Sequence, residues 1–398
     1  MNLSEKALGI KPSSTLSITE KAGLLRKEGK NVISFSIGEP DFDTPEHIKK
    51  AAIDAINEGF TRYTAAAGIV ELRQAVADKL KKDNGLDYDY TQIVISNGAK
   101  HSLINALMAV LNPGDEVIIP APFWLSYAEM VRIAGGTPVI VYTKQEENFA
   151  LTREVLESGY SDKTKAIIIT TPSNPTGMVM AEDELRKIAD FAVEKDIIVI
   201  ADEIYEKLIY SEDKKHISIA SFGKEIYDRT ITVNGVSKSY AMTGWRIGYT
   251  AAPLKIAKLM SSMQSHMTSN PNSIAQKAAL AAIAGPQDCV EEMRVQFEKR
   301  RDYIYDRAVK MPYISTLKPE GAFYLFIDFS GTYGKTYKGI KLESAAQIGA
   351  LLLDEKLIAV VPCADFGMPD HIRFSYATSI ENIKAGMDRL EEFLSEVK

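Results

Sequence analysis

Short apolar runs alternate with longer amphipathic segments along most of the 398-residue chain. The runs are rich in isoleucine and valine and nearly continuous, a pattern typical of strands that are buried on both faces of a parallel sheet. We predict a strand in each of these runs. They are VISFSIG (32–38), IVISNG (93–98), EVIIPAP (116–122), PVIVYT (138–143), KAIIITTP (165–172), IIVIADE (197–203), TITVNG (230–235) and RIGYTAAP (246–253).

Several of the segments between these runs have the pattern of helices. Residues 47–59 place apolar side chains at helical spacing, and Gly59 suits a helix C-terminus. Residues 181–196 open with acidic side chains, which favour a helix N-terminus. A further helix is expected at residues 17–29. The alternation of strands and helices predicts an α/β fold with helices on both faces of the sheet.

The pattern changes after residue 290, which indicates a second, smaller α+β domain. A long charged helix over residues 291–310 precedes strands at 321–329, 357–362 and 371–377, and a helix closes the chain. The N-terminal segment is too short to form its own unit, so we expect it to pack with this domain. The predicted units are an N-terminal arm with part of the small domain, a large domain and a C-terminal small domain, over residues 1–46, 47–290 and 291–398.

Composition and charge exclude several classes of protein. The net charge is −6 and no basic block occurs, so neither a nucleic acid nor a membrane surface is an expected partner. Two cysteines and five scattered histidines predict no disulfide framework and no metal site. No apolar run is long enough for a membrane span, and the N-terminus lacks the apolar region of a secretion signal. We therefore expect a cytoplasmic protein.

Chemically active residues follow several of the predicted strands. Ligands of open α/β sheets bind beyond the carboxyl ends of the strands, so these residues are expected to share one crevice. The set comprises a glycine at the start of a helix, an amide, a carboxylate, a phenol, a lysine and an arginine. These are Gly98, Asn174, Asp202, Tyr205, Lys238 and Arg246.

Each of these residues has a plain chemical use. The helix N-terminus after Gly98 offers N–H groups to a phosphate, and Ser237 and Arg246 could complete that site. Asp202, at the end of an apolar strand, is costly as an unpaired buried charge, and a protonated pyridine nitrogen would satisfy it. Lys238 is a natural nucleophile for a Schiff base. Taken alone, each residue could instead be a solvated or structural one.

Three segments carry a specific resemblance to a known family. SNPTG (173–177), ADEIYEKLIY (201–210) and VSKSYAMTGWRIGY (236–249) resemble the signature of class I aminotransferases of pyridoxal-phosphate (PLP) fold type I. The resemblance is nearest to the bacterial aspartate aminotransferases of subgroup Ib, and it covers essentially the whole chain. It implies a large PLP-binding α/β domain, with a mostly parallel seven-stranded sheet flanked by helices, and a smaller α+β domain.

The resemblance implies a role for each cofactor contact. Lys238 would hold PLP as a Schiff base and then shuttle a proton. Asp202 would pair with the ring nitrogen, Tyr205 and Asn174 would hydrogen-bond the ring oxygen, and Trp124 would stack on the ring. The phosphate would be held by two side chains and a helix start, at Ser237, Arg246 and the backbone of Gly98, Ala99 and Lys100.

The resemblance also implies a homodimer and a substrate. Tyr63 would reach the phosphate of the neighbouring subunit, so the two active sites would be shared. Arg373 would bind the substrate α-carboxylate through two hydrogen bonds, beside Gly38, Asn174 and Trp124. Lys100 stands where this subgroup places a lysine for a distal carboxylate. The predicted reaction is therefore L-aspartate with 2-oxoglutarate, giving oxaloacetate and L-glutamate by a ping-pong mechanism.

Other activities stay open from the sequence. An aromatic amino acid or prephenate could replace aspartate as the substrate of the same reaction. A PLP-dependent β-lyase shares this fold type and the lysine–aspartate pair, and it would release pyruvate and ammonia. A regulatory protein would need a DNA-binding extension, and a nicotinamide-dependent dehydrogenase is disfavoured because no GxGxxG follows an early strand.

Overall fold

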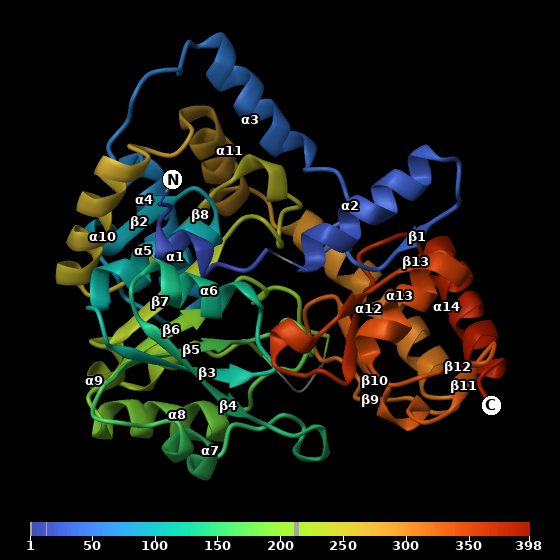
Figure 1. Cartoon of the computed structure of the whole chain (residues 1–398). Helices are drawn as coiled ribbons and strands as arrows, with labels where there is room; N and C mark the ends of the chain where they lie inside the picture. Colours follow the sequence, from blue (N-terminus) through green and yellow to red (C-terminus); the bar gives the residue numbers. More distant parts are fainter. Residues whose placement is uncertain (1, 13, 211–214) are drawn as a thin grey trace.

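A seven-stranded sheet forms the centre of the larger half of the molecule, and a smaller sheet lies beside it (Figure 1). The computed structural model describes residues 2–12, 14–210 and 215–398. The strand order of the large sheet is β2-β8-β7-β6-β5-β3-β4, and every neighbouring pair is parallel except the two that involve β8. Its strands are β2 (Ile93–Ser96), β3 (Glu116–Ala121), β4 (Thr137–Tyr142), β5 (Thr164–Thr170), β6 (Ile198–Asp202), β7 (Thr230–Gly235) and β8 (Gly248–Ala251).

The predicted α/β fold with a mostly parallel seven-stranded sheet is confirmed. Strand β5 shows why the apolar runs are continuous, because successive side chains of a strand point to opposite faces. Ile167 packs in one hydrophobic cluster with Leu185, whereas Ile168 packs in another cluster with Leu103. Helices thus bury both faces of the sheet, and both sets of positions must be apolar.

The helices follow the predicted amphipathic segments closely. The segment at 47–59 forms α3, and Gly59 just beyond it has a φ of 72°, as a helix C-terminal glycine requires. The helices are α1 (Glu5–Leu8), α2 (Ser14–Lys27), α3 (Glu46–Asn57), α4 (Val70–Asn84), α5 (Ala99–Val110), α6 (Ser126–Ile133), α7 (Arg153–Ser158), α8 (Glu182–Glu194), α9 (Lys224–Tyr227), α10 (Leu254–Met267), α11 (Ser273–Ala284), α12 (Asp288–Ala308), α13 (Ala345–Lys356) and α14 (Ile380–Ser395).

The smaller half is built around a four-stranded sheet of order β14-β15-β10-β9. The predicted single strand at 357–362 is wrong, because it divides into β13, which pairs with β1, and β14, which pairs with β15. The boundary predicted at residue 290 falls in the first turn of α12, and the domain division stays a prediction. The strands are β1 (Ile33–Ser34), β9 (Ser315–Thr316), β10 (Tyr324–Asp328), β11 (Thr336–Tyr337), β12 (Ile340–Lys341), β13 (Ile358–Ala359), β14 (Val361–Pro362) and β15 (His371–Ser375).

The topology brings distant segments to one edge of the large sheet. The parallel strands β2, β5, β6 and β7 all end at this edge, and antiparallel β8 begins there. Arg246, just before β8, therefore reaches the same edge as Asp202, which ends β6. The smaller half, with strand β10, lies beside this edge (Figure 1), and Tyr324 on β10 and Arg373 on β15 line a cavity together with Asp202. None of the helices in the described ranges has the length and apolar character that a membrane span needs.

Candidate active site

A cavity of about 290 Å³ lies between the edge of the large sheet and the smaller half. The convergence predicted from the strand ends is observed, because most of the predicted residues line this one space. Gly98 lies directly before the lining residue Ala99, and Tyr63 does not line the cavity. The predicted residues that line it are Gly38, Ala99, Lys100, Trp124, Asn174, Asp202, Tyr205, Ser237, Lys238, Arg246 and Arg373.

Asp202 is a buried carboxylate that lines the cavity. It is 4% exposed, and within the described residues it forms no ion pair, although the charge of Lys238 acts on it from a distance. Tyr127 Oη donates a hydrogen bond of 2.6 Å to Oδ2, and the Ile204 N–H donates one of 3.2 Å to Oδ1. Burial raises the pKa of Asp202 to about 6 despite these hydrogen bonds. The site therefore favours a ligand that brings a positive charge to this carboxylate.

Tyr127 is a site residue that the sequence analysis did not single out. Its hydroxyl joins Asp202 to Thr170, whose Oγ1 lies 2.5 Å away. Burial raises the pKa of Tyr127 well above its usual value, so the phenol keeps its proton and remains a donor. Tyr127 lies in the first turn of α6, three residues after Trp124, and no local pattern indicated that its hydroxyl would reach Asp202.

Lys238 follows β7 and points into the cavity. Its Nζ donates a hydrogen bond of 2.5 Å to the carbonyl of Gly38, from the N-terminal segment. Burial lowers the pKa of Lys238 to about 8, and the nearby charges of Arg373 and Arg246 act in the same direction. An amine with this pKa is partly neutral near pH 8, and only the neutral amine attacks a carbonyl carbon.

The phenols of Tyr205 and Tyr324 both line the cavity, and their hydroxyls are in direct contact. Tyr205 Oη and Tyr324 Oη are 2.8 Å apart, and Tyr324 is a second residue that the sequence analysis missed. Burial raises the pKa of Tyr205 well above its usual value, so Tyr205 stays protonated. A Cβ atom at Gly38 would lie 2.7 Å from Tyr324 Oη, and only glycine permits this close approach.

Arg373, on β15, is a buried guanidinium with no carboxylate partner within the described residues. It is 2% exposed, and its Nε has no hydrogen-bond partner. Its Nη1 donates to Asn174 Oδ1 at 2.9 Å, and its Nη2 donates to the carbonyl of Ser36 at 3.1 Å. The guanidinium also lies over the ring of Tyr324, 4.5 Å from the centroid. A buried, unneutralised guanidinium suits the fork geometry of a carboxylate ligand.

The start of α5 and the side chain of Arg246 form a cradle for an anion. Gly98 precedes the helix with a φ of 83°, and no described side chain caps this helix N-terminus. A Cβ at Gly98 would lie 2.4 Å from Arg246 Nη2, so glycine is needed for the guanidinium to lie there. Ser237 lines the cavity at the same edge. Helix N–H groups, a hydroxyl and a guanidinium are the donors that a phosphate requires.

Lys100 and Trp124 lie at one side of the cavity. Lys100 is an exposed residue of the first turn of α5, and its Nζ lies 4.7 Å from the centroid of the Trp124 ring. The ring of Trp124 packs edge-on against Tyr127, with centroids 5.4 Å apart. Thr15 and Leu16, at the start of α2, also line the cavity. No local motif marked those two residues, because their place depends on how the N-terminal arm packs.

Comparisons with known proteins agree with this geometry. The family model described as "Aminotransferase class I and II" matches residues 30–390. An aspartate aminotransferase of Geobacillus stearothermophilus is 44% identical, with 99% of each chain covered. A probable aspartate/prephenate aminotransferase of Aquifex aeolicus is 47% identical, again with 99% of each chain covered. The crystal structure of the aspartate aminotransferase of Rhizobium meliloti superposes with a TM-score of 0.96 at 38% identity, and 100% of each chain is covered.

Proposed function

The chain belongs to the class I and II aminotransferase family, and we propose that it transfers the amino group of L-aspartate to 2-oxoglutarate. One observation carries the proposal. Three side chains that can carry a charge line one cavity: the buried guanidinium of Arg373, the buried carboxylate of Asp202 and the amine of Lys238, whose pKa is lowered. No ion pair among the described residues neutralises them. Each charge is thus left for a ligand, and an amino acid with a phosphorylated pyridine cofactor supplies matching groups.

Pyridoxal 5′-phosphate fits the residues of this cavity. When bound, it supplies an aldehyde that accepts an amino group and a ring that withdraws electrons from the substrate α-carbon. Asp202 would hold the ring nitrogen in its protonated form, and Lys238 Nζ would hold the aldehyde carbon. Tyr205 and Asn174 would hydrogen-bond the ring oxygen, and Trp124 would lie against the ring. The phosphate would be bound by Ser237, Arg246 and the backbone of Gly98, Ala99 and Lys100.

The protein side chains then act on the amino acid. Arg373 orients it by its α-carboxylate, with Asn174 and the backbone of Gly38 beside it. Lys238 Nζ would carry the proton of the amino donor from its α-carbon to the aldehyde-derived carbon of the cofactor, and would move a proton in the opposite direction with the oxo acid, a task suited to its lowered pKa. The two substrates would use the same Arg373 site in turn, and the cofactor would hold the amino group between them, which gives the ping-pong order.

The Arg373→Lys variant is expected to lower kcat/KM for L-aspartate by about 100-fold, because lysine keeps the charge but loses the two parallel hydrogen bonds. Steady-state kinetics with L-aspartate and 2-oxoglutarate measure this. The control is Arg186→Lys on α8, whose exposed ion pair with Glu182 lies outside the cavity. Unchanged kinetics in Arg373→Lys would contradict the proposed carboxylate site.

The Lys100→Met variant tests the distal carboxylate. Lys100 would bind the second carboxylate of a dicarboxylic substrate, so the ratio of kcat/KM for aspartate to that for phenylalanine should fall about tenfold. The control is Lys255→Met, since Lys255 also lies in the first turn of a helix, α10, and does not line the cavity. An unchanged ratio would show that another group recognises the distal carboxylate.

Prephenate is the second candidate substrate. The Aquifex relative is named a probable aspartate/prephenate aminotransferase, and prephenate carries two carboxylates that Arg373 and Lys100 would bind. The cavity also has the apolar side chains of Leu16, Leu103 and Trp124 along its wall, against which a ring would pack. Aspartate and prephenate activities would then coexist in one site.

A homodimer in the cytoplasm completes the proposal. Tyr63 is 90% exposed, and Ile53 and Ile56 on α3 are exposed apolar residues, as expected for a surface that a second copy covers. Tyr63 would then reach the phosphate site of the partner. Cys289 and Cys363 are free thiols, which suits a reducing compartment.

The visible absorption of the purified, PLP-loaded protein tests the activity directly. L-aspartate should abolish the band of the bound cofactor, and 2-oxoglutarate should restore it. Phenylalanine, and prephenate together with aspartate, are tested in parallel. A band that responds only to phenylalanine would change the substrate, and steady release of pyruvate and ammonia would favour a β-lyase. No band after PLP is supplied would remove the proposal.

A further inference from the structure

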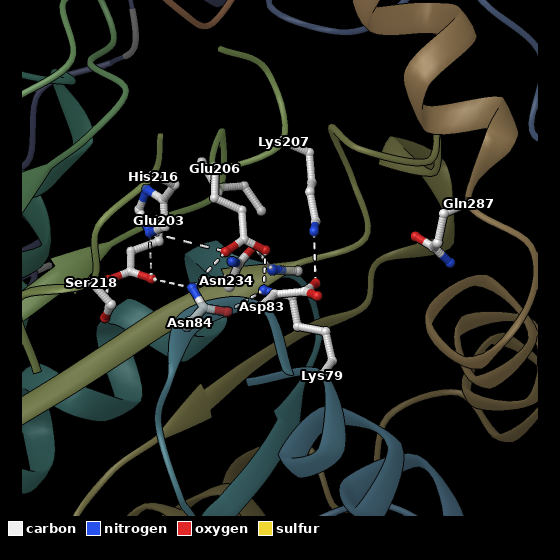
Figure 2. Close-up of polar contacts among 12 residues, drawn as sticks. Lys79, Asp83, Asn84, Glu203, Glu206, Lys207, His216, Ser218, Asn234 and Gln287 are labelled. Carbon is white, nitrogen blue, oxygen red and sulfur yellow. Dashed lines mark hydrogen bonds and ion pairs between the residues drawn. The ribbon is translucent and has the colours of Figure 1, made fainter. Parts of the chain in front are cut away.

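Two buried carboxylates, Glu203 and Glu206, lie in the turn that also carries Asp202 and Tyr205, and they share a network of polar contacts (Figure 2). Asp202 and Tyr205 line the cavity, whereas the residue after each of them, Glu203 and Glu206, does not. Glu203 is 1% exposed and Glu206 is 7% exposed. Neither takes part in the proposed chemistry. A buried charge is costly unless a basic or hydrogen-bonding group pairs with it. The groups that pair with Glu203 and Glu206 therefore indicate what the two carboxylates do.

Glu203 is held by a hydroxyl and an imidazole from one nearby segment. Ser218 Oγ donates a hydrogen bond of 2.6 Å to Oε1, and His216 Nε2 lies 2.9 Å from Oε2. Burial alone would lower the pKa of His216, but the carboxylates of Glu203 and Glu206 outweigh burial and raise it. The imidazole is therefore held toward its charged form and pairs with Glu203.

Glu206 is held by α4, which lies more than a hundred residues earlier in the chain. Lys79 Nζ forms an ion pair with Oε1, and Asn84 Nδ2 donates a hydrogen bond of 2.9 Å to Oε2. Burial alone would raise the pKa of Glu206, but Lys79 and His216 outweigh it and hold the pKa at about 2. Asn84 Nδ2 also lies 3.4 Å from Glu203 Oε2, so this amide joins the two carboxylates.

Basic side chains within the described residues already face both carboxylates of this network. Ligand atoms of Glu203, Glu206 and His216 lie within 4.8 Å of one another, which a metal ion could use. However, Lys79 already supplies a positive charge to Glu206, and the carboxylates raise the pKa of His216, which favours its charged form beside Glu203. A divalent cation would leave the buried cluster with a net positive charge, which is unfavourable. The arrangement thus favours an ionic network over a metal centre.

Backbone hydrogen bonds also hold this turn. The Glu203 N–H donates to the carbonyl of Val233 at 2.8 Å, and the Glu206 N–H donates to the carbonyl of Glu203 at 2.9 Å. The side chains of Glu203 and Glu206 add ties to α4 and to residues 216–218. Since Asp202 and Tyr205 are their direct neighbours in the chain, the contacts that hold the two glutamates also restrain the backbone of the two cavity residues.

We propose that Glu203 and Glu206 are positioning residues, whose buried network with Lys79, Asn84 and His216 fixes Asp202 and Tyr205 against the cofactor. The inference rests on the proposed function, which gives the turn its ligand. Binding groups act well only when they are held close to their working geometry, and supporting residues provide that rigidity. Loosening the network should therefore weaken cofactor binding and alter the hydrogen bond of Tyr205, without removing either contact residue.

The test uses the PLP-loaded Glu203→Gln variant, which removes the charge and keeps the shape of the side chain. We expect the Kd for PLP to rise about tenfold, as for other supporting residues of a bound group. We also expect the pH midpoint of the cofactor's visible absorption to move in the same direction as in Tyr205→Phe. The His216→Gln variant removes the partner of the same ion pair and should show both effects, and it replaces Glu203→Gln if that variant does not fold.

The matched control is Asp83→Asn. Asp83 pairs with Lys207 at 2.6 Å beside the network, and Asp83 bonds to neither glutamate in the described contacts (Figure 2). Its PLP affinity and pH midpoint should equal those of the wild type. If Glu203→Gln and His216→Gln lower only the thermal midpoint and leave both cofactor readouts unchanged, the network is merely structural and the inference is wrong. A wild type that binds no PLP would instead overturn the proposed function.

Discussion

Replacing Lys238 with alanine is expected to lower the turnover of L-aspartate by about 10⁴-fold or more, because both the covalent hold on the cofactor and the proton carrier are lost. PLP should still bind, since Asp202, Arg246 and the start of α5 are untouched. Stopped-flow absorption with L-aspartate measures the loss.

Borohydride reduction followed by mass spectrometry checks the attachment separately. The wild type should gain the mass of the cofactor on the peptide that contains Lys238, and the alanine variant should not. The control is Lys255→Ala, on the exposed start of α10. Cofactor mass on another lysine of the wild type, or near-normal turnover of Lys238→Ala, would contradict the assignment.

The Asp202→Asn variant is expected to change activity and stability in opposite directions. An amide cannot hold the ring nitrogen in its protonated form, so turnover should fall about 10³-fold, the cost of removing one partner of a buried ion pair. In the cofactor-free protein, the same change removes a buried carboxylate that forms no ion pair within the described residues. Its pKa is raised from 3.8 to about 6, which corresponds to about 3 kcal/mol of destabilisation when the group is ionised.

The pH dependence of that stability has a definite sign. A carboxylic acid with a raised pKa in the folded state favours its protonated form there, so its unfavourable contribution is absent below pH 3.8 and grows as the pH rises to about 6. Urea unfolding of the cofactor-free proteins should therefore show Asp202→Asn to be more stable than the wild type at pH 8, with a smaller difference at pH 4.5. A variant that is less stable at both pH values would show that the lost hydrogen bonds outweigh the buried charge.

Local signals explain how much of the site was predictable. Four site residues stand at the ends of apolar strands: Asn174 and Lys238 shortly after one, Asp202 at the last position of one, and Arg246 just before one. Strands of one parallel sheet present their carboxyl ends at one edge, so these residues were expected to meet. The composition of those runs already identified them as strands, so the convergence could be inferred before any contact was known. Arg373 was placed by its family motif alone, since its strand carries no signal that it faces this edge.

The residues that were missed depend on packing between distant segments. Tyr127 meets Asp202 across 75 positions of the chain, and Tyr324 meets Tyr205 across 119 positions. Nothing in the periodicity around Tyr324 says which strand end it will face. The sequence also could not show that the strand at 357–362 divides between two sheets, because both halves are equally apolar.

The sequence by itself determined the strand and helix pattern, the kind of fold and the residue types at the strand ends, because these follow from local spacing and from a long, specific motif. Only the tertiary structure decided that Asp202 and Arg373 form no ion pair within the described residues, and that Glu203 and Glu206 are held by His216 and Lys79. Burial and pairing are properties of the space around a side chain. That space is set by segments far apart in the chain, and local patterns do not encode which of them meet.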